Sequence, residues 1–178
     1  MIDLNDKQAI SAIDKSNAYS SVINLAKQCQ QAWDDTQKII FPQDYKDVDS
    51  IVLCGMGGSA YAALIIKALY ANSLTVPFEL VNGYNLPNYV NNKTLVLLSS
   101  YSGSTEEVLN CGKEALLRNA KITGVCNGLA LGEFFKTNNL PGYIFEATHN
   151  PANQPRLGQG YMIFGHIGLL TKIGLLDV

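Results

Sequence analysis

A serine-rich stretch is the part of the sequence best suited to bind an anion. Residues 99–105, the serine loop, contain four serines and one threonine around Gly103, and they directly follow an apolar run. Several hydroxyl groups and main-chain N–H groups gathered in one concavity can hold an anion without a strong cation beside it. A phosphate monoester is the anion that suits such a loop best.

The same loop has a plainer interpretation as a helix cap. Ser102 or Ser104 would cap the helix that follows, and Glu106 with its neighbouring glutamate would lie favourably in the first turn. A cap uses one hydroxyl group, so it leaves Ser100 and Thr105 unexplained.

A second loop is rich in glycine. Residues 55–60, the glycine loop, read GMGGSA and follow another apolar run. Glycines allow the main chain to turn tightly and to approach a ligand, and the next helix presents free N–H groups there. Read alone, the loop fits the G-x-G-x-x-A dinucleotide fingerprint, but that fingerprint needs an acid near the end of the second strand. That run ends at Asn82, with Glu79 near its start. The interpretation of this loop as a glycine turn that only packs the strand against the helix also remains open.

The elements that must position these loops alternate along the chain. We expect strands at 50–54, 78–81, 94–98, 122–126 and 143–147, and helices at 59–71, 105–119, 129–137 and 157–176. Short apolar strands that alternate with helices predict an α/β fold, with a five-stranded parallel sheet flanked by helices on both faces. Ligands of such sheets bind beyond the carboxyl ends of the strands, where both loops fall.

The first forty residues favour helix. Asn17 is a candidate cap for a long helix whose apolar face follows three-and-four spacing. That face comprises Val22, Leu25, Ala26, Cys29, Trp33 and Ile40.

Composition limits the classes of function. The chain has 178 residues, one domain's worth, with a net charge of −2, so a nucleic-acid binder is not expected. The four cysteines form no CxxC pair, and Cys54 and Cys126 lie in apolar runs as expected buried thiols. We expect no metal and no cofactor. The polar, acidic segment 1–10 is no signal peptide, and the apolar stretch 161–176 is too short and polar to span a bilayer. A cytoplasmic location without membrane association is therefore the default expectation.

The motifs together resemble a known family. The run SYSGSTEE at 100–107 resembles the S-x-S-G-x-T-x-E signature of sugar isomerase (SIS) domains, which bind phosphosugars. GMGGS at 55–59, followed by Pro155-Arg156, narrows the resemblance to the bifunctional phosphoglucose/phosphomannose isomerase family. The departures are Ala60 for a usual glycine, Ser104 for a usual asparagine, and the Leu-Gly-Gln that follows Arg156. They bear on substrate preference.

The resemblance implies a function and a domain plan. It implies a flavodoxin-like, doubly wound SIS domain over residues 1–178, with leading helices at 1–45 and an α/β core at 50–178. The implied reaction interconverts glucose 6-phosphate or mannose 6-phosphate with fructose 6-phosphate through an enediol. In the family, the glutamate base and the assisting histidine and lysine belong to a second SIS domain, which this chain does not reach before Val178. The alternatives are a non-catalytic phosphosugar sensor and a Rossmann-type dinucleotide domain, against which the serine loop argues.

The resemblance also implies roles for individual residues. The sugar phosphate would be bound by five of them, and Arg156 would lie near the reacting carbons as the catalytic cation. The five are Gly58, Ser59, Ser100, Ser102 and Thr105. His149 and His166 could in principle replace the missing base, but we interpret them as a surface and a packed histidine. The isolated chain is therefore expected to bind a phosphorylated hexose and to isomerise it poorly.

The C-terminal helix predicts association. The stretch 157–176 carries more apolar residues than one face against a sheet can bury. We therefore expect a homo-oligomer or a second SIS domain to cover the remainder.

Overall fold

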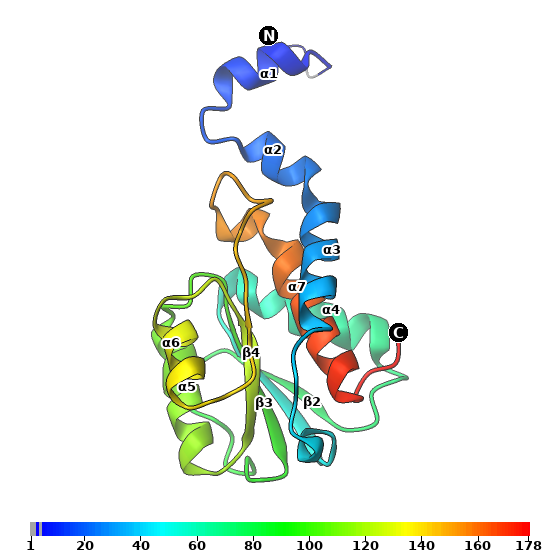
Figure 1. Ribbon diagram of the computed structural model, residues 1–178, viewed down its shortest axis with the longest axis vertical. Helices are drawn as coiled ribbons and strands as arrows, with labels where there is room; N and C mark the ends of the chain where they lie inside the picture. The colour runs from blue at the N-terminus through cyan, green and yellow to red at the C-terminus, as the bar shows by residue number, and fades with distance from the viewer. Residues whose placement is uncertain (1–2, 4) are drawn as a thin grey trace.

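The computed structural model describes residue 3 and residues 5–178; Met1, Ile2 and Leu4, part of the polar N-terminal segment, lie outside the described residues. Its centre is a five-stranded parallel sheet in the order β2-β1-β3-β4-β5 (Figure 1). The strands are β1 (Ser50–Gly55), β2 (Phe78–Val81), β3 (Thr94–Ser100), β4 (Lys121–Cys126) and β5 (Tyr143–Ile144). The predicted doubly wound α/β fold is confirmed.

The order of the strands determines where a ligand can bind. The chain passes from β1 outward to β2 and then returns to β3 on the other side of β1. This reversal is the switch point at which doubly wound sheets bind ligands. In the register of β1 and β3, Gly55 is paired with Ser99, so the glycine loop and the serine loop begin side by side.

Two helical layers bury the sheet. Helices α3 (Leu25–Thr36), α4 (Tyr61–Tyr70) and α7 (Gln159–Ile173) cover one face, and α5 (Glu106–Leu117) and α6 (Leu129–Thr137) cover the other (Figure 1). Successive residues of β3 serve opposite layers: Leu95 and Leu97 pack with α4 and α7, whereas Val96 and Leu98 pack with α5 and α6. Burial on both faces explains why the strands are continuous apolar runs in the sequence.

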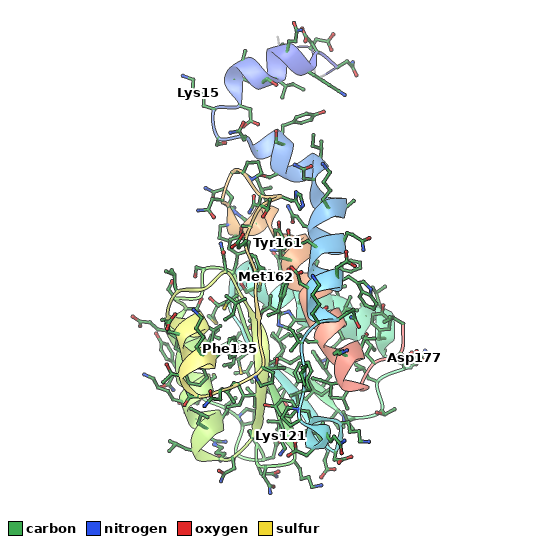
Figure 2. All side chains as sticks on the ribbon, viewed as in Figure 1. Lys15, Lys121, Phe135, Tyr161, Met162 and Asp177 are labelled. Atoms are coloured by element: carbon green, nitrogen blue, oxygen red, sulfur yellow. The ribbon has the colours of Figure 1, made fainter. Side chains whose placement is uncertain are left out.

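Buried aromatic side chains pack in both helical layers. Figure 2 shows Tyr161 beside α3 and Phe135 on α6. Tyr161 is fully buried, and its ring stacks on Phe145 with ring centroids 4.6 Å apart. Within the described residues, no helix is both long and apolar enough to cross a membrane.

The leading region differs from the predicted long helix. It forms α1 (Lys7–Ile13), α2 (Ala18–Ile23) and α3, and α1 projects away from the body (Figure 1). Asn17 lies at the start of α2 with a left-handed backbone, but its side chain makes no cap hydrogen bond. The predicted apolar face is confirmed only in part: Trp33 packs against the core, but Val22, Leu25 and Ile40 are exposed. The residues of α3 that are buried against the body are instead Gln28, Ala32 and Thr36.

The last two predicted elements are also shorter than expected. Strand β5 ends at Ile144 because the chain then turns toward α3, where Gln31 Nε2 donates to the Glu146 carbonyl at 3.1 Å. Helix α7 is almost entirely buried between α3, α4 and the sheet. The apolar surplus that the sequence assigned to a second chain is therefore largely covered by this chain's own α3, and Phe164 remains 37% exposed.

Three short turns complete the chain. They are η1 (Gln43–Lys46), η2 (Gly57–Ala60) and η3 (Pro155–Leu157). Two of them, η2 and η3, contain predicted site residues and contact one another.

Candidate functional site

The glycine loop and the serine loop are joined by direct hydrogen bonds. The main-chain N–H of Tyr101 donates to Ser59 Oγ at 3.0 Å, and Ser99 Oγ donates to the Ser59 carbonyl at 2.7 Å. Ser99 is fully buried in β3, and its hydroxyl group holds the glycine loop against that strand through this hydrogen bond. Because Ser59 Oγ accepts from Tyr101, its own hydrogen remains available to a ligand.

The serine loop has a network of its own. The hydroxyl groups of Ser100 and Thr105 lie 2.7 Å apart, and Ser100 Oγ also accepts from the main-chain N–H of Gly103 at 3.0 Å. Gly103 has a φ of +74°, and a β-carbon there would lie 1.9 Å from the Gly128 carbonyl oxygen. Glycine is therefore required at this turn, both for its backbone angle and for the close approach of the neighbouring loop.

The structure supports only part of the helix-cap interpretation of the loop: Glu106 and Glu107 lie in the first turn of α5, but neither Ser102 nor Ser104 is its N-cap. Helix α5 begins at Glu106, and Thr105 at its N-cap makes no side-chain cap hydrogen bond. Ser102 is exposed, and its Oγ accepts from the N–H of Ser104 at 3.3 Å and from Ser104 Oγ at 3.1 Å. The N–H groups of the first turn of α5, with the positive end of the helix dipole, therefore face the loop uncapped.

A third segment reaches the serine loop through Tyr101. This arginine segment, residues 149–160, includes η3 with Pro155 and Arg156 (orange in Figure 1, between α2 and α7). The buried Tyr101 hydroxyl accepts from Asn150 Nδ2 at 2.7 Å. Gly158 lies directly against the same ring, since a β-carbon there would be 2.1 Å from Tyr101 Cε2. Burial raises the pKa of Tyr101, which keeps its hydroxyl protonated.

Arg156 lies at the outer side of this segment. Its side chain is exposed and lines a hollow of about 210 Å³ together with Leu25, Leu157 and Gln159. Among the described residues its guanidinium group forms no ion pair. Gln159 Nε2 lies 3.1 Å from the position of a β-carbon on Gly58, which places the arginine segment beside the glycine loop as well.

The structure thus brings all three predicted motifs together. Gly58 and Ser59 lie in η2, Ser100 ends β3, Ser102 and Thr105 follow in the serine loop, and Arg156 is in η3. Sequence reasoning gave no role to Ser99, Tyr101, Asn150 or Gln28, which connect these motifs. Tyr101 lies inside the SYSGSTEE signature, so the sequence could have pointed to it as a residue of the site. Gln28 gave no signal, because a polar residue in an amphipathic helix normally faces water.

The two histidines are not placed to serve as a base. His166 is fully buried, its Nδ1 lies 2.6 Å from the Met162 carbonyl, and burial lowers its pKa to about 4. It is the packed histidine that the sequence predicted. His149 lines a separate hollow of about 370 Å³ with Lys27, Asp34 and other residues of α3 and its C-terminal end, and no residue of the glycine loop, the serine loop or η3 lines that hollow.

The cysteines and acidic residues assemble no further centre. Cys54 and Cys126 are buried free thiols, as predicted. Over the described ranges, no group of three or more His, Cys, Asp and Glu side chains is arranged to hold a metal ion. A dinucleotide site would need an acid near the end of β2, where the chain has Asn82. Glu79 lies near the start of β2 and accepts from the Tyr89 hydroxyl at 2.5 Å.

The doubly wound sheet with a serine loop at its switch point defines the class of domain. Residues 44–130 match the SIS domain family, and the chain therefore contains an SIS domain. The chain is homologous to the bifunctional phosphoglucose/phosphomannose isomerase of Caldicellulosiruptor bescii, with 34% identity over 160 residues. That match covers 89% of this chain and 46% of the relative, so the chain spans about half the length of this curated relative. The dinucleotide alternative is not favoured.

Solved structures share the fold. The tagatose-6-phosphate ketose/aldose isomerase of Escherichia coli superposes with a TM-score of 0.56 at 15% identity, over 91% of this chain and 46% of that one. The Vibrio vulnificus NanR protein complexed with ManNAc-6P superposes with a TM-score of 0.57 at 16% identity, over 92% of this chain and 67% of that one. At these identities the likeness concerns the fold alone.

Proposed function

We propose that this SIS domain binds the phosphate group of a phosphorylated hexose between the glycine loop and the serine loop. The observation that carries the proposal is the uncapped first turn of α5 at the switch point, with the hydroxyl groups of Ser100 and Thr105 beside it. Main-chain N–H groups, a helix dipole and several hydroxyl donors are the chemistry that a phosphate monoester needs. The ManNAc-6P complex of NanR, which shares the fold, supports the same class of ligand.

Most of the proposed phosphate contacts have a free donor. Gly58 offers a main-chain N–H group, and the hydroxyl of Ser59 keeps its hydrogen free for an anion, whereas the Ser59 N–H already donates to the Met56 carbonyl at 3.1 Å. Ser102 offers its hydroxyl hydrogen, and Ser100 and Thr105, whose hydroxyl groups bond each other, leave one hydrogen between them. Hydrogen bonds to a charged group are worth about 1.5–3 kcal/mol each, so a few of them suffice for useful affinity.

We further propose that the whole protein is an aldose–ketose isomerase that acts on glucose 6-phosphate or mannose 6-phosphate and fructose 6-phosphate. The homology to the bifunctional isomerases supports this reaction. Arg156 would donate to the oxyanion that develops at C1 or C2, a task for which the planar guanidinium group is better suited than lysine. The reaction also needs a positioned base, and we assign that base to a second SIS domain outside residues 1–178.

The partner of this domain is proposed on two grounds. The curated relative is about twice as long as the chain. Helix α4 also exposes apolar side chains, namely Tyr61 (53%), Leu64 (51%) and Leu69 (68%). We propose that a second SIS domain, or a second copy of this chain, covers that surface.

A cytoplasmic location fits the buried free thiols.

Calorimetric titration tests the binding proposal. Fructose 6-phosphate should bind the 178-residue chain without added metal, and fructose at the same concentration should give no heat beyond dilution. Inorganic phosphate should compete with the sugar phosphate. Equal binding of fructose and fructose 6-phosphate would contradict a site built around phosphate.

A further inference from the structure

The arginine segment is held from one side by a buried glutamine. Gln28 of α3 is fully buried. Its Nε2 donates to the carbonyl oxygens of His149 at 3.1 Å and Leu157 at 2.8 Å, and its Oε1 accepts from the N–H of Gly160 at 3.2 Å. One carboxamide therefore bonds the beginning, the turn and the end of the segment.

A second buried carboxamide holds the segment from inside. Asn150 is 2% exposed, and its Nδ2 donates to the Tyr101 hydroxyl at 2.7 Å and to the Gln154 carbonyl at 2.9 Å. The main chain is thus fixed two residues before Arg156 by Asn150 and one residue after it by Gln28. The guanidinium group itself stays exposed.

Packing alone does not require these groups. Burying a carboxamide is unfavourable unless its hydrogen bonds are made, and an apolar residue fills such a position more readily. Ala32, one turn along the same face of α3, is an example. Gln28 also donates to the Ser21 carbonyl at 3.3 Å, and Asn150 to the Tyr101 hydroxyl, but their other hydrogen bonds go to the arginine segment. Their main effect is therefore to fix the conformation of that segment.

We propose that Gln28 is a positioning residue for the sugar end of the site. Together with Asn150 it holds the main chain around Arg156 against the serine loop, so that the guanidinium group is presented to a sugar already bound by its phosphate. The inference rests on the proposed function. It assigns to the N-terminal helix α3 a role in ligand recognition that no motif in the sequence indicates.

The test compares two ligands in matched variants. Gln28→Met removes the hydrogen bonds at similar volume, whereas Thr36→Val alters another buried polar residue of α3 whose hydroxyl bonds within the helix, to the Trp33 carbonyl. Gln28→Met should weaken fructose 6-phosphate by about fivefold or more and inorganic phosphate by less than about twofold, because phosphate alone contacts only the loops. Thr36→Val should change neither affinity.

A double-mutant cycle separates positioning from general stability. Arg156→Ala should weaken fructose 6-phosphate in the unchanged chain and have little further effect in Gln28→Met. Should Gln28→Met not fold, Tyr101→Phe deletes the acceptor of Asn150 while keeping the ring, and the same loss selective for the sugar phosphate is expected. Equal losses for both ligands, or an Arg156→Ala effect of the same size in both backgrounds, would overturn the inference alone. No binding of fructose 6-phosphate by the unchanged chain would overturn the proposed function and this inference with it.

Discussion

The α-carbon of Gly158 lies against the ring of Tyr101 so closely that a β-carbon there would be 2.1 Å from Tyr101 Cε2. This contact connects the arginine segment with the serine loop, which are 57 residues apart in the sequence (158 minus 101). Both residues are buried, and Phe145 packs edge-on to the same ring with centroids 5.3 Å apart. The ring is therefore confined between Gly158 and Phe145.

Gly158→Ala should consequently destabilise the fold by about 1–3 kcal/mol, the usual cost of overpacking a buried contact. The matched control is Gly83→Ala, since no atom lies within 4 Å of its β-carbon position and its φ is not positive. The control should change the free energy of unfolding by less than about 0.5 kcal/mol. Urea denaturation of both variants checks this, and equal stabilities would show that the contact tolerates a methyl group.

Gly103→Ala, in the serine loop, should destabilise the fold at least as much as Gly158→Ala does. The substitution combines a left-handed backbone with a β-carbon 1.9 Å from the Gly128 carbonyl oxygen. Gly57 separates the two effects, because its φ is +53° but its β-carbon position is open. Gly57→Ala should cost only the backbone strain, about 1–2 kcal/mol. The melting temperature of Gly103→Ala should be lower than that of Gly57→Ala. The reverse order would mean that the contact with Gly128 is unimportant.

Burial of His166 predicts a dependence of stability on pH. Burial lowers its pKa to about 4, so the folded state holds the neutral ring while the unfolded chain takes up a proton near pH 6.5. The contribution of the neutral His166 ring to stability is fully present above about pH 6.5. As the pH drops toward 4, the free energy of unfolding falls by up to about 3 kcal/mol because of this group. His166→Gln should remove that component. Urea unfolding at pH 7.5 and pH 5 measures it, and an identical pH dependence in both proteins would contradict the burial argument.

The isolated chain should turn over fructose 6-phosphate poorly. Positioned acid–base catalysis supplies about 10²–10⁴-fold in rate, and neither histidine of the chain is placed to provide it. A coupled assay for glucose 6-phosphate should therefore find little or no activity. Turnover of about one per second or faster, within the ordinary range for enzymes, would reveal an overlooked base, and His149 would be the first residue to replace.

The apolar runs made the sheet predictable from the sequence. Strands buried on both faces are continuous runs of Val, Ile and Leu, and β1 to β4 fall within two residues of the predicted bounds. The loops after β1 and β3 were predictable for the same reason, because glycines and serines interrupt those runs abruptly.

The contacts that assemble the site were not predictable. Gln28, Asn150 and Tyr101 act through hydrogen bonds between segments far apart in the chain, and no local pattern encodes such partners. The leading helix was mispredicted for a related reason. Its fully buried residues are Gln28, Ala32 and Thr36, two of them polar, so hydrophobic spacing found only Trp33 among the residues that pack against the body.

The affinity of the Ser102→Ala, Thr105→Ala double variant for fructose 6-phosphate tests the central claim most directly. The variant removes two hydroxyl donors proposed to bind the phosphate, each worth about 1.5–3 kcal/mol, so calorimetry should find binding at least about tenfold weaker. Ser104→Ala, in the same loop but with no proposed phosphate contact, should bind nearly as the unchanged chain does. Unchanged affinity in the double variant would contradict a phosphate site at the serine loop.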